Sequence, residues 1–268
     1  MNLKINFTDY SNFIYDRIKI SLGHAYPNGK LKEEHIHTAL EGVKATMDIN
    51  KLLLNEIKIN INKEDEKSLE LLLSLNNIAL DRIKRSYTNG TLDEWVTTHA
   101  NLTSLYDTRT AIKNCVDILG FKQVEVDLLR LCNGLYNHDY IYRYVVSNDK
   151  IKQENLHVAC QISIIRLHSI IHIIENAYKN NQNHPQASFV KKILDQSKST
   201  LKGFNEAYPN GYYSPDLGWT VFKISHGRIN EIKKLIEDSK YYFNNEETKK
   251  EVNVKEDNKP KGSVNYSI

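Results

Sequence analysis

Apolar residues recur along most of the chain at the three- and four-residue spacing that is typical of amphipathic helices. Polar segments rich in Asn, Asp and Gly separate these stretches, and Asn137-His138-Asp139 interrupts one of them before Tyr140. The pattern predicts an all-α fold with about eight main helices. They are expected near residues 8–25, 32–58, 66–87, 92–118, 123–135, 151–178, 187–206 and 215–244.

A five-residue turn motif organises this pattern. Ala25-Tyr26-Pro27-Asn28-Gly29 recurs unchanged at residues 207–211, and degraded copies stand at 86–90 and 145–149, so the motif returns about every 60 residues. Proline and glycine in these positions favour a tight turn. The spacing predicts four helix-turn-helix repeat units, stacked as an open array or closed into a compact bundle. The units cover residues 8–60, 64–120, 121–180 and 185–245, within one domain (1–245) that a polar, disordered tail follows (246–268).

Composition narrows the class of protein. The net charge is only +3, and basic residues are scattered among acidic ones, which argues against nucleic acid or an anionic membrane as an obligate partner. Three cysteines without C-x-x-C spacing favour a reducing compartment. The N-terminus resembles no secretory signal, and the apolar stretch at 162–174 looks too short and too polar to span a bilayer. A cytoplasmic location is therefore expected.

The expected helix at 151–178 carries the sharpest candidate chemistry. Three histidines, a glutamine and a glutamate share one face of an otherwise apolar helix, and that stripe contains no lysine. Two imidazoles four residues apart can bind one metal ion from adjacent turns, and a glutamate one turn further is a third possible ligand. The stripe therefore predicts a divalent transition metal (Fe, Mn or Zn), although a solvated stripe without metal explains the same pattern. Its residues are His157, Gln161, His168, His172 and Glu175.

A second constellation follows from aligning the repeats. Glu34-x-x-His37 and Glu154-x-x-His157 occupy equivalent positions in units one and three. Paired E-x-x-H motifs supply ligands in di-iron helical bundles, which also require carboxylates from two further helices. A glutamate in the first turn of a helix is also favoured by the helix dipole alone, so the motif has a structural interpretation beside the metal one.

Three tyrosines share the position just before the repeated turn. Tyr26, Tyr87 and Tyr208 either pack the helix ends or form a ligand-binding row along one side of the protein.

Motifs for nucleotide binding, serine hydrolysis and H-E-x-x-H zinc proteases are absent from the sequence. A nucleophilic pair of Cys132 with His138 stays open, without a third orienting group. The leading hypothesis is a cytosolic α-helical repeat protein that binds a protein partner or a small ligand. The alternative is a metal-dependent enzyme, a hydrolase or a di-iron-type oxidoreductase, that uses the His/Glu stripe.

Overall fold

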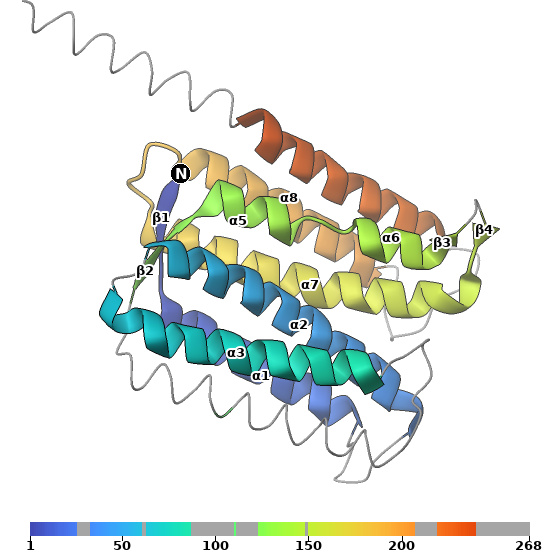
Figure 1. Ribbon diagram of the computed structural model, residues 1–268. Helices are drawn as coiled ribbons and strands as arrows, with labels where there is room; N and C mark the ends of the chain where they lie inside the picture. Colours follow the sequence, from blue (N-terminus) through green and yellow to red (C-terminus); the bar gives the residue numbers. More distant parts are fainter. Residues whose placement is uncertain are drawn as a thin grey trace, which may run out of the picture.

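The structure is a computed structural model, and it describes residues 1–25, 33–60, 63–86, 110, 123–147, 150–206 and 219–239. Helices dominate these residues, which confirms the all-α prediction (Figure 1). Within the described residues, seven helices are delimited at both ends, where about eight main helices were expected. Residues 219–239 are also helical. The seven are α1 (Phe7–Ala25), α2 (Glu33–Asn60), α3 (Lys63–Ser86), α5 (Leu128–Leu135), α6 (Asp139–Val145), α7 (Gln153–Asn180) and α8 (Ala187–Glu206).

Two short sheets accompany the helices. Strand β1 (Asn2–Ile5) pairs antiparallel with β2 (Val124–Asp127), and β3 (Val146–Ser147) pairs with β4 (Lys150–Ile151). The prediction of one helix over 123–135 was therefore wrong in its first five residues. They form an extended strand because Val124 and Val126 alternate with polar residues, so one face is buried against α2. Asp127 then starts α5 by accepting hydrogen bonds from the backbone N–H groups of Leu129 and Arg130.

Helices α2 and α7 form the centre of the bundle (Figure 1). Helix α2 contacts α1, α3 and α5, and α7 contacts α1, α6, α8 and β1; the two central helices also contact each other. The predicted apolar stripe of α2 is confirmed in its described members, because Leu40, Val43, Met47 and Leu54 are fully buried. One hydrophobic core includes residues from Leu3 to Ile236. The described helices therefore form a closed bundle.

Asparagine side chains attach β1 to the end of α7. The amide of Asn176 accepts a hydrogen bond from the backbone N–H of Asn6 (2.7 Å) and donates to its carbonyl (2.9 Å). Asn181 contacts Lys4 in the same way, accepting at 3.1 Å and donating at 2.7 Å. These amides act as a third strand would and satisfy the outward backbone groups of Lys4 and Asn6.

The repeat stays a prediction at this point. Three of the four turn motifs, with Tyr26, Tyr87 and Tyr208, lie wholly or largely outside the described residues, and so does almost all of the helix expected at 92–118. Of the motif at 145–149, the structure describes Val145, at the end of α6, and strand β3. Unit three differs from unit one, because a strand and two short helices stand in place of one long first helix, and the interruption expected before Tyr140 is confirmed between α5 and α6.

Helix α7 is the most apolar helix of the bundle. Its segment Asn155–Asn180 is long and apolar enough to cross a membrane by length and composition, which corrects the expectation that this region is too short. Most of that segment is buried among the other helices, as the core helix of a bundle would be.

Candidate functional site

The histidine stripe of α7 faces α1, which the sequence alone did not reveal. The His172 ring stacks on Phe13 with 4.0 Å between ring centroids and 6° between their planes. Its Nε2 lies 3.2 Å from Oδ2 of Asp9, and the same oxygen accepts a hydrogen bond from Asn176 Nδ2 at 2.9 Å. The guanidinium of Arg17 lies over the Phe13 ring, with its carbon Cζ 5.1 Å from the ring centroid. The stripe is thus partly covered by aromatic and charged side chains of α1.

Burial governs the charge of these histidines. It lowers the pKa of His172, against the opposing influence of Asp9 and Glu175. It lowers the pKa of His168 to about 4, and the positive charge of Arg17 acts in the same direction. It also lowers the pKa of His157. At neutral pH these imidazoles are therefore uncharged, a state that suits either metal ligation or simple packing.

The stripe does not converge on one point. His157 and His168 are eleven residues apart, which places them roughly 16 Å apart along the helix axis. Glu175 binds lysines instead, with its carboxylate 2.9 Å from Lys198 Nζ and 4.0 Å from Lys179 Nζ, and the hydrogen bond from Lys198 lowers its pKa. Within the described part of the chain, no group of three His, Cys, Asp or Glu side chains is placed to hold a metal ion. The side chains of Glu34, His37 and Glu154 lie outside what the structure describes.

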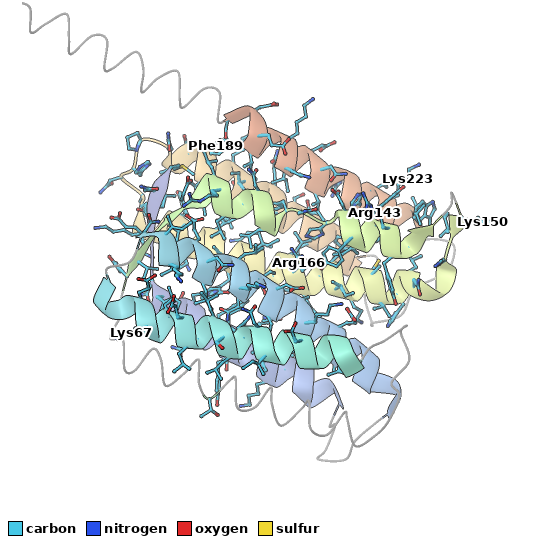
Figure 2. The ribbon with its side chains drawn as sticks, in the orientation of Figure 1. Lys67, Arg143, Lys150, Arg166, Phe189 and Lys223 are labelled. Carbon is cyan, nitrogen blue, oxygen red and sulfur yellow. The ribbon has the colours of Figure 1, made fainter. Side chains whose placement is uncertain are left out.

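A different cluster, which the sequence reasoning missed, lies where α6 meets α7. Arg166 projects from α7 with only 3% of its surface exposed. Its Nη2 donates to the Leu135 carbonyl (3.1 Å) and its Nη1 to the Tyr140 hydroxyl (3.3 Å), while Nε has no hydrogen-bond partner among the described residues. No described carboxylate lies within ion-pair distance of its guanidinium. Figure 2 shows Arg166 inside the bundle and Lys150 at its edge, and Arg143 and Lys150 are both exposed.

His138 stands beside this arginine at the start of α6. It is 1% exposed, and neither ring nitrogen has a hydrogen-bond partner within the described ranges. Burial lowers its pKa well below the usual value, and Arg166 and then His226 add to the effect. We call Arg166, His138 and Tyr140 the Arg–His cluster. Unpartnered polar groups at this depth are uncommon in folded proteins, and each costs roughly 1–3 kcal/mol.

The helix at 219–239 closes the cluster from one side. His226 stacks on Tyr142 of α6 with ring centroids 4.7 Å apart, and Phe222 packs beside both rings. Lys233 lies 3.8 Å from Asp139, the first residue of α6. Aromatic and ionic contacts therefore hold this last helix against α6 and place His226 near His138.

The sequence contained one usable signal for the cluster. Arg166 stands alone between Ile165 and Leu167 in the most apolar helix of the chain, where a charged residue is costly unless something compensates it.

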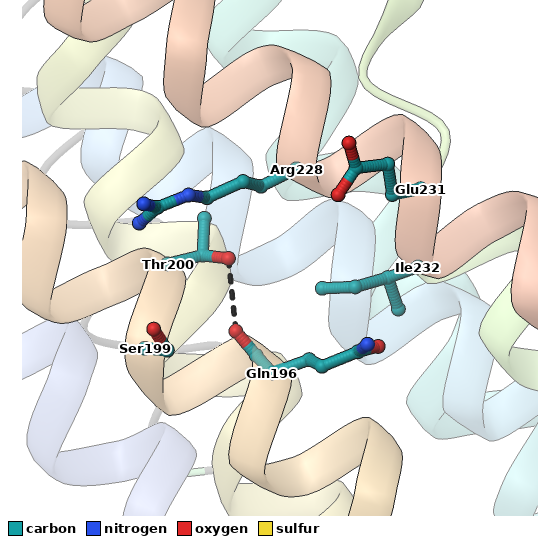
Figure 3. A pocket seen from close by; sticks show the side chains of 6 residues that line it. All are labelled: Gln196, Ser199, Thr200, Arg228, Glu231 and Ile232. Carbon is teal, nitrogen blue, oxygen red and sulfur yellow. Dashed lines mark hydrogen bonds between the residues drawn. The ribbon is translucent and has the colours of Figure 1, made fainter.

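Two shallow depressions lie elsewhere on the surface. The first, about 220 Å³, lies between α8 and the helix at 219–239, with Arg228 and Glu231 on one side and Gln196 and Thr200 on the other (Figure 3). The second, about 460 Å³, is wide open between α7 and α8. Their charged groups are solvent-exposed, in contrast to Arg166.

The suggested nucleophile Cys132 is fully buried, and burial raises the pKa of its thiol, so the reactive thiolate is disfavoured.

Comparison with models of protein families, with curated proteins and with solved structures found no match. The function is therefore inferred from the side chains described above.

Proposed function

We propose that this chain is an α-helical binding protein of the cytoplasm that holds a small ligand at the Arg–His cluster. The observation that carries the proposal is the pair of buried side chains, Arg166 and His138, that have unused hydrogen-bonding groups among the described residues. A ligand that supplies the missing partners would offset the cost of burying them. The predicted fourfold arrangement of helical hairpins belongs to this proposal, as the scaffold that presents the site.

The cluster also has the composition expected of a ligand site. Small-molecule sites combine apolar and aromatic walls with a few polar groups that set orientation. Here Tyr142, Phe222 and His226 supply aromatic surface, and Arg166 and His138 supply the polar groups. We prefer the binding hypothesis to the metal enzyme because, among the described side chains, no three potential metal ligands of the histidine stripe come together.

The decisive variant is His138→Leu. It removes two unpartnered ring nitrogens, so the free energy of unfolding should rise by roughly 1–2 kcal/mol while ligand binding is lost. A gain in stability with a loss of function distinguishes a binding residue from one that merely supports the fold. Chemical denaturation measures the first quantity.

Binding is measured by incubating the purified protein with an extract of small cytosolic metabolites, followed by gel filtration and mass spectrometry of retained compounds. The wild type should retain at least one compound that His138→Leu releases. Arg143→Gln is the matched control, because Arg143 is exposed on the same short helix. Equal retention by wild type and His138→Leu would refute the assignment of the site.

A further inference from the structure

We propose that the ligand of the Arg–His cluster carries a carboxylate, and that this carboxylate binds between the guanidinium of Arg166 and the hydroxyl of Tyr140. This inference rests on the proposed function and specifies its ligand chemistry. Three observations support the carboxylate: the unused N–H groups of Arg166, the charges around its guanidinium, and the exposure of Tyr140.

Most N–H groups of the Arg166 guanidinium have no acceptor among the described residues. A guanidinium has five N–H groups, and only two of them have acceptors among the described residues. Both acceptors, the Leu135 carbonyl and the Tyr140 hydroxyl, are neutral, so neither cancels the buried positive charge. Arginine binds planar carboxylates through two parallel N–H groups, a mode that the unused Nε permits.

The charges around the guanidinium favour a single negative charge. His138 and His226 are neutral because burial lowers the pKa of each. Lys233 is paired with Asp139 at the start of α6. Burial raises the pKa of Tyr140, and the charges of Asp48 and Glu41 on α2 act in the same direction. One cation with acidic residues nearby suits a monoanion better than a doubly charged phosphate.

Tyr140 supplies the route by which an anion reaches Arg166. Its side chain covers the guanidinium, with the ring centre 5.5 Å from the Arg166 carbon Cζ, yet Tyr140 is 44% exposed. Burial raises the pKa of its hydroxyl, which therefore stays protonated and can donate a hydrogen bond to a carboxylate. This half-exposed side chain is therefore the part of the cluster that lies between Arg166 and solvent.

The aromatic side chains beside the cluster suggest an apolar or aromatic tail on the acid. Tyr142, Phe222 and Trp219 form a chain of rings that reaches His226, the neighbour of His138. We therefore choose benzoate as the probe, with benzamide as its neutral isostere and with acetate and inorganic phosphate as further arms.

The experiment is isothermal titration calorimetry on the full chain at low and moderate salt. Benzoate should bind at least tenfold more tightly than benzamide and more tightly than acetate or phosphate, and salt should weaken it. Arg166→Met should abolish the preference for benzoate. Tyr140→Phe should weaken benzoate about three- to tenfold and leave benzamide unchanged. Arg228→Gln, which alters an exposed arginine in the groove of Figure 3, should change nothing.

The outcomes separate the two proposals. If benzamide binds as tightly as benzoate and His138→Leu abolishes both, the small-ligand site stands and the carboxylate inference fails. If phosphate binds more tightly than benzoate, the choice of a monoanionic carboxylate is wrong. Benzoate binding that survives both Arg166→Met and Tyr140→Phe places the acid elsewhere and also overturns the inference. If Arg166→Met fails to fold, the relative affinities of Tyr140→Phe for benzoate and benzamide test the carboxylate inference in its place.

Discussion

At the scale of single residues, the burial of His168 makes the stability of the protein depend on pH. Its pKa in the folded protein is about 4, against a usual value of 6.5, because burial and the nearby Arg17 disfavour the imidazolium. Between these two values the unfolded chain binds more protons than the folded one. Stability is therefore full above pH 6.5 and is lost as the pH falls towards 4. The partial exposure of His168 reduces the effect to roughly 1–2 kcal/mol.

The variant His168→Gln tests this expectation. It should remove part of the acid-induced loss of stability between pH 6.5 and 4, and it should leave the remaining part to His172 and His157, whose pKa values are also lowered. Urea denaturation at half-unit pH steps measures the slope. An unchanged slope in the variant would show that His168 does not titrate in this window.

Residue patterns predicted some of these neighbours and missed others. The helical period correctly placed His168 and His172 on one face of α7. Their partners Asp9, Phe13 and Arg17 stand about 150 residues earlier, and helical periodicity holds no information on contacts between distant helices. The Arg–His cluster has the same origin, because α6, α7 and the helix at 219–239 each contribute to it.

At the scale of elements, the long helices were predictable and the short strands were not. Helices α1, α2, α3, α7 and α8 begin and end within about three residues of the expected positions. Strands β1 and β2 have four residues each, so two buried side chains per strand are their whole alternating signal. Their pairing joins residues about 120 positions apart, which no local pattern encodes.

The attachment of β1 to α7 gives an element-scale prediction. Asn176→Ala leaves the backbone N–H of Asn6 without its partner in a partly buried position, while the Asn6 carbonyl keeps the hydrogen bond from the Tyr10 N–H, so it should lower the free energy of unfolding by roughly 1–3 kcal/mol. Asn181→Ala is the matched control. It removes the equivalent bonds to Lys4 at a more exposed position, where water can replace them, so its cost should stay below about 1 kcal/mol.

Urea denaturation measures both costs, and hydrogen exchange of the Asn6 amide reports the local effect. Faster exchange at Asn6 in Asn176→Ala alone is the expected result. Equal costs for the two variants would mean that the amides of α7 do not determine the stability of this edge.

At the scale of the whole molecule, the bundle differs from an open array in how many other elements each helix contacts. In an array of repeats, a unit contacts only its neighbours, and damage at one end leaves the other end intact. Here α7 contacts α1 as well as α8, and β1 pairs with a strand from the middle of the chain. The first helix and the last therefore share one core.

Two core truncations test whether this shared core unfolds as a unit. Ile14→Ala in α1 and Phe204→Ala in α8 each remove a fully buried side chain, and each should cost roughly 2–5 kcal/mol. In a Trp95→Phe background, Trp219 fluorescence reports the helix at 219–239, which packs on α6 and α8, and far-ultraviolet circular dichroism reports all helices. Because the core is continuous, Ile14→Ala should move both transitions together. Ile20→Ala, at an exposed position of α1, should move neither by more than about 0.5 kcal/mol. If Ile14→Ala left the Trp219 unfolding transition unchanged, the two ends would fold independently, as in an array of repeats.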